Sequence, residues 1–205
     1  MVQSVLARRT EAARVLGRAF QSDPLFVYLM PSAEVRAVVA PAFFGVVAAY
    51  AQAYGVLDLA PDGAGAACWL RPGQTTLKVR QMLGLGRPPW RLWRALFLFG
   101  VRRMRQLMTI SDYAEEQHRR GMPGEHWYLW AFGVDPDRQG RGVGGGLLQV
   151  GLDRADAERK PCYLEANNVL NVSFYQKRGF KVVNHGQAAG HEVTFWAMRR
   201  EPQVS

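Results

Sequence analysis

A glycine-rich turn between two apolar segments carries the clearest chemistry in this sequence of 205 residues. It is called the glycine turn below and reads Gln139-Gly140-Arg141-Gly142-Val143-Gly144. Glycine permits positive φ angles and lets the backbone come close to a ligand. A helix that begins here would add unpaired N–H groups and the positive end of its dipole. The glycine turn is therefore predicted to bind a pyrophosphate, with Arg138 and Arg141 adding positive charge.

The same glycines fit more than one phosphate-binding motif. Gly140, Gly142 and Gly145 satisfy the dinucleotide pattern G-x-G-x-x-G, and Glu165 follows at a distance suited to a ribose contact. A dinucleotide-binding unit normally begins a long parallel sheet, however, and only about sixty residues follow Gly145. The P-loop pattern G-x-x-x-x-G-K does not occur in the sequence. A P-loop is therefore excluded by pattern, and NAD binding stays as an alternative.

The segments around the glycine turn alternate between apolar strands and helices. Residues 127–134 and 161–166 are continuous apolar runs, which are typical of strands buried on both faces. A helix is predicted between them over 143–158. A short helix over 172–178 and strands over 180–184 and 192–199 are predicted to follow. The strand–helix–strand order favours a right-handed parallel crossover.

The first half of the chain is predicted to contain helices and one hairpin. A short strand is expected over 5–9, a helix over 10–20, and a second helix over about 33–53 that Pro41 kinks or restarts. Strands over 55–60 and 66–70 flank the turn Pro61-Asp62-Gly63, which is a hairpin signal. Residues 75–120 form a basic helical pattern, within which Ser111-Asp112 would start a further short helix.

Composition favours a globular protein with an anionic ligand or partner. Of the residues, 48% are hydrophobic and 21% charged, and the formal net charge is +9. Cys68 and Cys162 lie far apart in apolar runs, so buried free thiols in a reducing cytoplasm are predicted. The four histidines lack metal-motif spacing, and no metal is expected. Residues 1–20 lack the apolar core of a secretory signal, and charges interrupt the longest apolar runs, so membrane insertion is not expected.

Two motifs in order resemble those of one enzyme family. Val134-Asp135-Pro136 with the glycine turn resembles motif A of the GNAT superfamily of acetyltransferases, whose pattern is Q/R-x-x-G-x-G/A. Asn171-Val172-Ser173-Phe174-Tyr175-Gln176-Lys177-Arg178-Gly179-Phe180 resembles motif B. Together with His126-Trp127-Tyr128-Leu129 and Tyr163-Leu164-Glu165-Ala166, these motifs are most similar to the puromycin N-acetyltransferase-like subgroup.

The resemblance implies the α/β (α+β) GNAT fold, a mixed central β-sheet flanked by helices. It implies a single domain over 1–205, with an acyl-CoA-binding core at 126–184 and a basic helical insertion at 75–120. The insertion has three functional readings, which are a lid, an anionic or membrane-facing surface and a homodimer contact. A face of ordinary amphipathic helices is the structural alternative.

The resemblance also implies direct transfer of an acetyl group from acetyl-CoA to an amine. The strand before the glycine turn would splay from its neighbour, and Phe132 and Val134 would hold the pantetheine arm through main-chain atoms. The glycine turn would bind the pyrophosphate, and Asn171 would contact the cofactor. Tyr175 stands where many members carry the tyrosine proposed as general acid, and a phenol with a pKa of about 10 is protonated at neutral pH.

The general base and the acceptor site are less determined. Glu165, at the end of a strand facing the cofactor cleft, is the first candidate for the base, and Glu125 is the second. Either could instead be a solvated carboxylate at a strand end. Asp23 and Tyr28 lie in the region that lines the acceptor site in GNAT folds, although Asp23 also suits a turn before Pro24.

Two classes of function follow from these features. The first is a cytoplasmic acetyl-CoA-dependent N-acetyltransferase acting on a small-molecule amine. The second is a GNAT-fold sensor that binds acyl-CoA without turnover; the presence of Tyr175 favours the enzyme. Binding to nucleic acid is not expected, because nothing in the sequence demands it.

Overall fold

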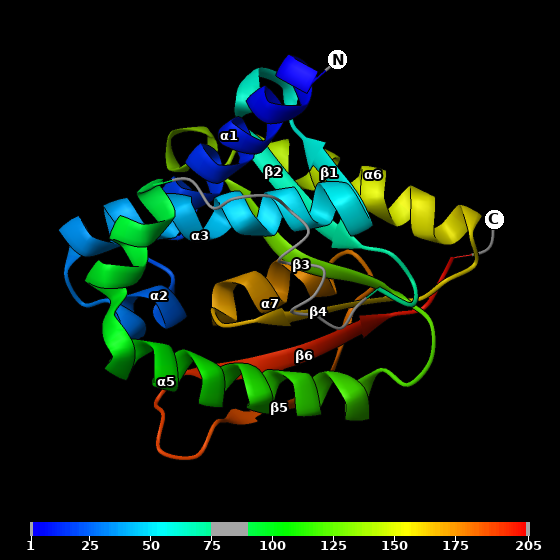
Figure 1. The fold of residues 1–205 in the computed structure, drawn as a ribbon. Helices are drawn as coiled ribbons and strands as arrows, with labels where there is room; N and C mark the ends of the chain where they lie inside the picture. The colour runs from blue at the N-terminus through cyan, green and yellow to red at the C-terminus, as the bar shows by residue number, and fades with distance from the viewer. Residues whose placement is uncertain (1, 75–89, 204–205) are drawn as a thin grey trace.

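The computed structural model describes residues 2–74 and 90–203, and these contain a six-stranded mixed sheet flanked by helices (Figure 1). The strands, in the spatial order β1-β2-β3-β4-β6-β5, are β1 (Gly55–Leu59), β2 (Gly65–Leu70), β3 (Trp127–Val134), β4 (Cys162–Ala166), β6 (Thr194–Arg200) and β5 (Lys181–Gln187). The helices are α1 (Val2–Ala19), α2 (Pro24–Leu29), α3 (Ala33–Tyr54), α5 (Trp90–Gly121), α6 (Val143–Ala157) and α7 (Val169–Gln176). Two 3₁₀ turns are η1 (Pro61–Gly63) and η2 (Pro136–Arg138).

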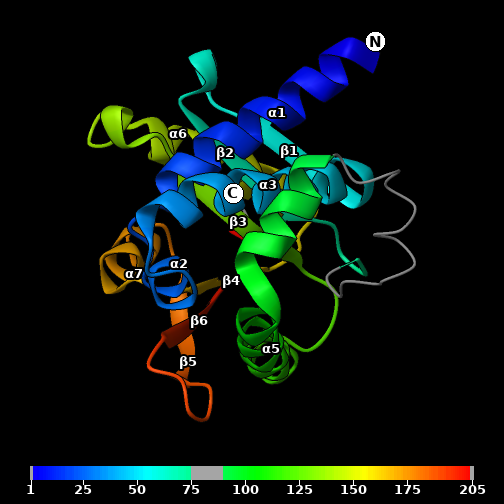
Figure 2. The ribbon, with the colours of Figure 1, turned by 60° about the vertical axis from the view of Figure 1, so that its left-hand side comes forward.

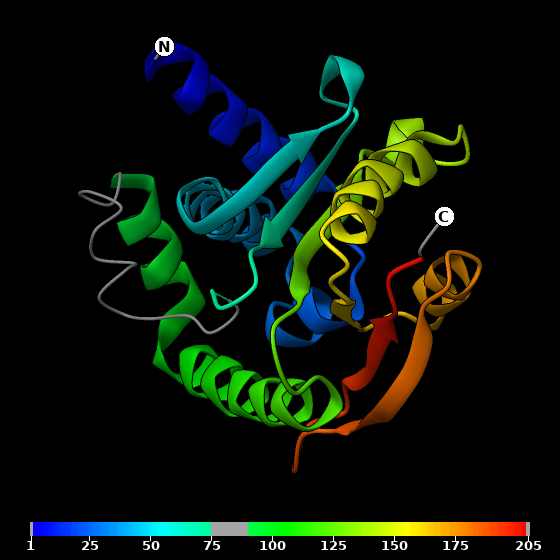
Figure 3. The ribbon, with the colours of Figure 1, turned by 90° about the vertical axis from the view of Figure 1, so that its right-hand side faces the viewer.

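The helices cover the sheet in two layers. Helices α1, α3 and α5 lie on one face, and α6 and α7 lie on the other (Figure 3). Two large hydrophobic clusters correspond to these layers, one under α1 and α3 and one under α6 and α7. The predicted mixed sheet flanked by helices is therefore confirmed.

Among the described residues, only one strand pair is parallel, namely β3 with β4. All four other pairs are antiparallel. The predicted parallel crossover through α6 and the predicted hairpin of β1 and β2 are both confirmed. A dinucleotide-binding unit needs a run of parallel strands, so this topology contradicts the NAD alternative.

Strand β3 separates from β4 after two residue pairs. Trp127 pairs with Cys162 and Tyr128 with Tyr163, and no described strand pairs with this edge of β3 beyond them. A β-bulge in the pairing of β3 with β2 accounts for the change of direction, because Trp69 lies opposite Leu129 while Cys68 lies opposite Ala131. A bulge bends a strand and increases its twist. The splay that the resemblance implied is thus present.

The bulged residue is Trp130, whose side chain lies on the same face as that of Ala131. The Trp130 ring packs edge-on against Tyr50 of α3 at 5.6 Å, and Ala131 lies in the same cluster. Phe132 and Leu129 both lie in the opposite cluster, under α6 and α7. The bulge therefore shifts the alternation of side chains by one residue, so that Ala131 and Trp130 share a face and Phe132 lies on the other.

Two predicted elements before β3 are wrong. Residues 5–9 are part of α1 and not a strand, since the shielded residues Val5, Arg9, Ala12 and Leu16 recur at helical spacing. Ser111-Asp112 starts no helix, because α5 continues through it with Ile110 packed in the core. The break in α5 is at Gly100, whose φ of 75° places it in the left-handed region that glycine tolerates.

Helix α7 also begins earlier than residue 172. The side chain of Asn168 accepts a hydrogen bond from Leu170 N at 3.0 Å and caps the helix, so α7 starts at Val169. Residues 75–89 of the predicted basic helical segment lie outside the described residues.

Helix α3 is the exception to the expectation that no apolar run reaches membrane-spanning length. It has 22 residues and a mean hydropathy of 1.5, enough by length and composition to cross a membrane. It packs against α1, α5, β1 and β2. Its buried residues are Val39, Ala40, Phe44, Val47, Ala48, Tyr50 and Ala51. These contacts are those of a core helix.

Candidate active site

The glycine turn leads from η2 into α6 and leaves its main chain open. Gly140 and Gly142 have φ angles of 74° and 81°, and α6 begins at Val143 without a side-chain cap. No described residue accepts a hydrogen bond from the N–H groups of residues 140–145. A run of free N–H groups at a helix start has the chemistry of an anion site, and the pyrophosphate site stays a prediction.

Two residues of the glycine turn, Gln139 and Gly144, fix how the turn packs against the end of β3. The Gln139 amide donates a hydrogen bond to the Val134 carbonyl at 3.1 Å, which ties the glycine turn to the end of β3. A Cβ atom at Gly144 would lie 3.3 Å from Val134 Cγ2 and 3.5 Å from Phe132 Cζ. Phe132 and Val134 therefore have side chains directed at α6, and only their main chain remains for a ligand on the β4 side.

Arg178 is a residue near the glycine turn that sequence reasoning missed. Its guanidinium lies 3.7 Å from the centre of the Phe174 ring and donates to the Phe174 carbonyl at 2.7 Å. A Cβ atom at Gly145 would lie only 2.8 Å from Arg178 Nη2, so the glycine admits this cation beside the start of α6. Its position within motif B was the only sequence signal.

Asn171 lies in the first turn of α7 and is exposed, so its side chain is available to a ligand. Sequence reasoning did not single out Asn168, which caps the same helix.

Tyr175 lies inside α7 with its ring almost fully buried. The aromatic rings around it belong to Phe132, Phe174 and Phe180, at centroid distances of 6.3, 5.2 and 5.7 Å. Burial raises the pKa of Tyr175 above its usual value, while Arg178 acts in the opposite direction. No hydrogen bond joins its hydroxyl to another described residue. The phenol is therefore a proton donor that stays protonated at neutral pH.

Asp23 and Tyr28 flank the same region from α2. Asp23 caps α2 by accepting from Leu25 N at 3.0 Å and from Phe26 N at 3.3 Å, and burial raises its pKa to about 6. The carboxylate of Asp23 also contributes to the raised pKa of Tyr175. Tyr28 hydrogen-bonds His191 Nδ1 at 3.0 Å, which joins α2 to the loop between β5 and β6.

Glu165 lies in a group of side chains that we call the buried cluster, comprising His118, His126, Tyr128, Tyr163 and Glu165. The Tyr128 hydroxyl donates to Glu165 Oε2 at 2.8 Å, and His118 Nδ1 lies 3.9 Å from Glu165 Oε1. The His118 ring stacks on Tyr163 at 4.2 Å. Burial raises the pKa of Glu165 to about 7, although the two tyrosine hydroxyls act in the opposite direction. Such a carboxyl group can take up a proton at neutral pH.

Glu125, the other candidate base, has a different environment. It lies at the surface and forms an ion pair with Lys160 at 2.7 Å, which lowers its pKa. A solvated, paired carboxylate is a weaker base than Glu165.

The two candidate catalytic residues lie on opposite faces of the sheet. Leu164 and Ala166 of β4 pack in the same cluster as Tyr175, so Glu165 between them points to the other face. Tyr128 on β3 shares that face with Glu165. Glu165 lies in the part of β4 that is no longer paired with β3, because the pairing of the two strands ends at Tyr128 and Tyr163.

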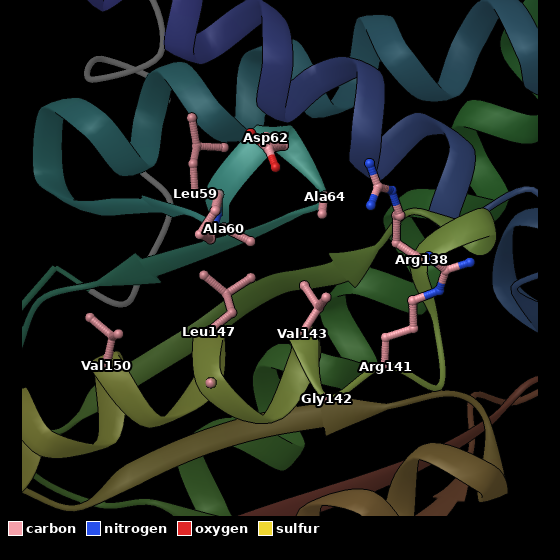
Figure 4. Close-up of a pocket in the computed structure, with 12 residues that line it drawn as sticks. Leu59, Ala60, Asp62, Ala64, Arg138, Arg141, Gly142, Val143, Leu147 and Val150 are labelled. Carbon is pink, nitrogen blue, oxygen red and sulfur yellow. The ribbon is translucent and has the colours of Figure 1, made fainter.

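Two surface grooves adjoin the glycine turn. The larger, of about 430 Å³, runs between the β1–β2 hairpin and α6, with Arg138 and Arg141 at one end and Leu59, Leu147 and Val150 along it (Figure 4). The smaller, of about 240 Å³, is polar and lies between α1 and η2. Neither groove is lined by Tyr175 or Glu165.

The two cysteines lie inside the fold. Cys68 and Cys162 are buried free thiols, as predicted, and burial raises the pKa of both, that of Cys162 to about 12. Within residues 2–74 and 90–203, no three His, Cys, Asp or Glu side chains form a group that could hold a metal ion.

Comparison with known families bears on the same part of the chain. Residues 100–180, which include the glycine turn, Glu165 and Tyr175, match the model of the acetyltransferase (GNAT) family. This region is therefore similar to members of the GNAT acetyltransferase family. The puromycin N-acetyltransferase-like subgroup is not identified by this match.

Curated relatives are similar to less than a third of this chain. A mycothiol acetyltransferase of Clavibacter michiganensis is 34% identical over 71 residues, covering 29% of this chain and 23% of the relative. One of Corynebacterium aurimucosum is 37% identical over 76 residues, covering 30% and 25%. The chain thus spans about a quarter of the length of these relatives.

A solved structure from Corynebacterium glutamicum, described as histone acetyltransferase HPA2 and related acetyltransferase, has the same fold. It matches with a TM-score of 0.59 and 20% identity, covering 97% of this chain and 93% of that one. The likeness extends the GNAT fold from residues 100–180 to nearly the whole chain.

Proposed function

We propose that this protein transfers an acetyl group from acetyl-CoA to the amine of a small molecule. The observation that carries the proposal is that the pairing of β3 with β4 ends after two residue pairs, next to the free N–H groups that follow β3. These N–H groups and Tyr175 lie on one side of the sheet, and the proton-accepting Glu165 lies on the other. An enzyme of this kind needs an anion site, a proton donor and a proton acceptor.

The residues present fit acetyl-CoA. The N–H groups of residues 140–145 would hold its pyrophosphate, with Arg138, Arg141 and Arg178 adding positive charge. The unpaired edge of β3 offers main-chain groups to an amide-containing arm, and Asn171 is free to contact the cofactor. When bound, acetyl-CoA supplies a thioester that is open to attack by an amine.

Glu165 and Tyr175 would divide the proton transfers between them. Glu165 would take a proton from the incoming ammonium, because only a neutral amine is nucleophilic. Tyr175 would donate its hydroxyl proton to the departing sulfur. Since the pKa of Glu165 is about 7, the fraction of ionised base grows as the pH rises through neutrality. The rate should therefore rise with pH in this range.

A small-molecule acceptor is favoured by the relatives. Two relatives that match this chain at 34 and 37% identity are named mycothiol acetyltransferases, and the sequence motifs resemble the puromycin N-acetyltransferase-like subgroup. Aminonucleosides, aminoglycosides and polyamines are the small-molecule amines that we propose to test as acceptors. We further propose that the protein works in the cytoplasm, because both thiols are free and buried.

A two-part experiment tests the proposal. Thermal unfolding with acetyl-CoA, with NADH or with buffer alone should show a raised Tm for acetyl-CoA only. Puromycin, spermidine and an aminoglycoside are then mixed with acetyl-CoA, and release of free thiol is followed. Binding of acetyl-CoA without thiol release across a broad amine panel would favour the sensor instead. Protection by NADH alone would contradict the proposal outright.

A further inference from the structure

The buried cluster contains a pair of histidines whose protons can be located from their partners. His126 Nδ1 lies 2.7 Å from the Gly124 carbonyl, and His126 Nε2 lies 2.6 Å from His118 Nε2. A carbonyl oxygen only accepts hydrogen bonds, so His126 Nδ1 must carry a proton. If both rings are neutral, His126 Nε2 is bare and accepts from His118 Nε2.

Both rings are neutral for a physical reason. Burial disfavours a positive charge on either ring, and it lowers the pKa of His118 to about 3 and that of His126 below its usual range. The nearby Arg199 further disfavours a charge on His126. Since a neutral imidazole carries one proton, His118 Nδ1 is then bare. Its lone pair faces Glu165 Oε1 at 3.9 Å.

A nitrogen without a proton interacts differently with the ionised and the protonated form of a neighbouring carboxyl group. The ionised carboxylate and the lone pair of His118 Nδ1 are both acceptors and repel each other. Once Glu165 carries a proton on Oε1, it can donate to His118 Nδ1 after the two atoms approach by about 1 Å. Glu165 Oε2 meanwhile continues to accept from Tyr128. The histidine therefore favours the protonated carboxyl group.

Resting on the proposed role of Glu165, we propose that His118 is a positioning residue that receives the hydrogen bond of Glu165 after this carboxylate takes the amine proton, and that His126 holds His118 in the required tautomer. The proton moves from the ammonium nitrogen to Glu165 Oε1 and remains there, shared with His118 Nδ1. No covalent bond of either histidine ring is broken.

The remaining titratable and charged groups near this pair come from four elements. Tyr128 on β3 and Tyr163 on β4 lower the pKa of Glu165, because their hydroxyls favour its ionised form. Glu115 on α5 acts on Tyr128, and Arg199 on β6 acts on His126. The preference of His118 for the protonated form of Glu165 thus opposes the two tyrosines.

The chain offers a matched set of variants. His118→Phe keeps a ring in the stack on Tyr163 but removes the acceptor. His126→Leu leaves His118 in place but removes its hydrogen-bond partner, so His118 can adopt the tautomer with its proton on Nδ1, facing Glu165. His126→Gln is the conservative control, because an amide can donate to the Gly124 carbonyl through nitrogen and accept from His118 through oxygen.

The titration of Glu165 is followed by carboxyl ¹³C NMR on the full chain without substrate, with the signal assigned by Glu165→Gln. The midpoint should fall by about one pH unit in His118→Phe and His126→Leu and stay near the wild-type value in His126→Gln. Equal midpoints in all four proteins would overturn the proposal. Thermal melts confirm that each variant is folded.

Imidazole ¹⁵N NMR of the wild-type protein gives a second test that no variant can confound. His118 should carry its proton on Nε2 and His126 on Nδ1 down to about pH 5.5. A His118 ring with its proton on Nδ1, or a pair that titrates near pH 6.5, would refute the proposal. Neither measurement depends on turnover. A failure here is thus separate from a failure of the proposed acetyl transfer.

Discussion

The glycine turn follows the end of β3, the buried cluster gathers near the start of the same strand, and the two are built in opposite ways. The glycine turn is exposed, short in sequence, and presents main-chain N–H groups from residues 140–145. The buried cluster consists of side chains from α5, β3 and β4 together with the segment before β3. The glycine turn presents main-chain groups because its glycines have no side chains, whereas the buried cluster is formed by side chains from several elements.

This difference suits the glycine turn to binding the cofactor and the buried cluster to proton transfer. Main-chain donors at a helix start hold an anion without depending on pH, since they do not titrate. A buried carboxyl group with a pKa of about 7 responds to pH and changes its charge during a proton transfer. Substitutions in the glycine turn should therefore affect affinity for acetyl-CoA, and substitutions in the buried cluster should affect turnover.

The largest effect is expected from Glu165→Gln. Loss of the base should lower kcat by about 10²–10⁴-fold, because an amide cannot take a proton from the amine. The pH dependence near neutrality should disappear with it. Isothermal titration should give an unchanged Kd for acetyl-CoA. A large loss of affinity would show that the two regions are not separable as described.

The same substitution should also change the dependence of stability on pH. The pKa of Glu165 is raised from 4.5 to about 7, so the folded protein keeps a proton that the unfolded chain releases. The wild-type protein should lose stability as the pH rises from about 5 to about 8, and Glu165→Gln should be spared this loss of about 2–3 kcal/mol. Urea unfolding of both proteins at pH 5 and pH 8 measures the difference. Parallel curves would mean that Glu165 is not buried in solution.

Tyr175→Phe tests the proton donor on the other face of the sheet. Turnover should fall by about 10- to 100-fold, while the Kd for acetyl-CoA should change little, since the ring still packs against Phe132 and Phe180. Tyr113→Phe, in α5, serves as the matched control and should retain activity. If Tyr175→Phe acts at the wild-type rate, the phenol takes no part in the reaction.

Two glycines four residues apart give the most direct test of the anchor. Gly142→Val places a β-branched residue at a φ of 81°, which should distort the glycine turn and weaken acetyl-CoA binding about tenfold. Gly146→Ala, one turn further into α6, meets no atom within 4 Å. It should leave affinity unchanged and add about 0.5–1 kcal/mol of stability. Equal affinity in both variants would remove the glycine turn from the cofactor site.

The same contrast explains what could be predicted from the sequence. The glycine turn was recognisable because its function depends on a few consecutive residues. Tyr175 and Glu165 could be named through the resemblance and the end of a strand. His118 carried no such signal, because it lies in a basic helix and meets Glu165 only after α5 packs on the sheet.

The register of β2 against β3 and the position of the break in α5 could not be predicted from the sequence either. The bulge at Trp130 is a relation between β2 and β3, and neither strand reveals it alone. Likewise, Ser111-Asp112 has the residue types of a helix start, yet the packing of Ile110 keeps α5 continuous. Gly100, unremarked in the sequence, is where the helix breaks.

The two buried cysteines have a consequence for the order of events in turnover. A thiol carries an acyl group between substrates only if it can ionise and be reached. Cys68 and Cys162 are buried with raised pKa values, so neither can store an acetyl group. In the proposed direct transfer, the acetyl group passes through neither cysteine, and both substrates would be bound together before either product leaves. Double-reciprocal plots of initial rates should give intersecting lines, and no burst of thiol should precede the steady state.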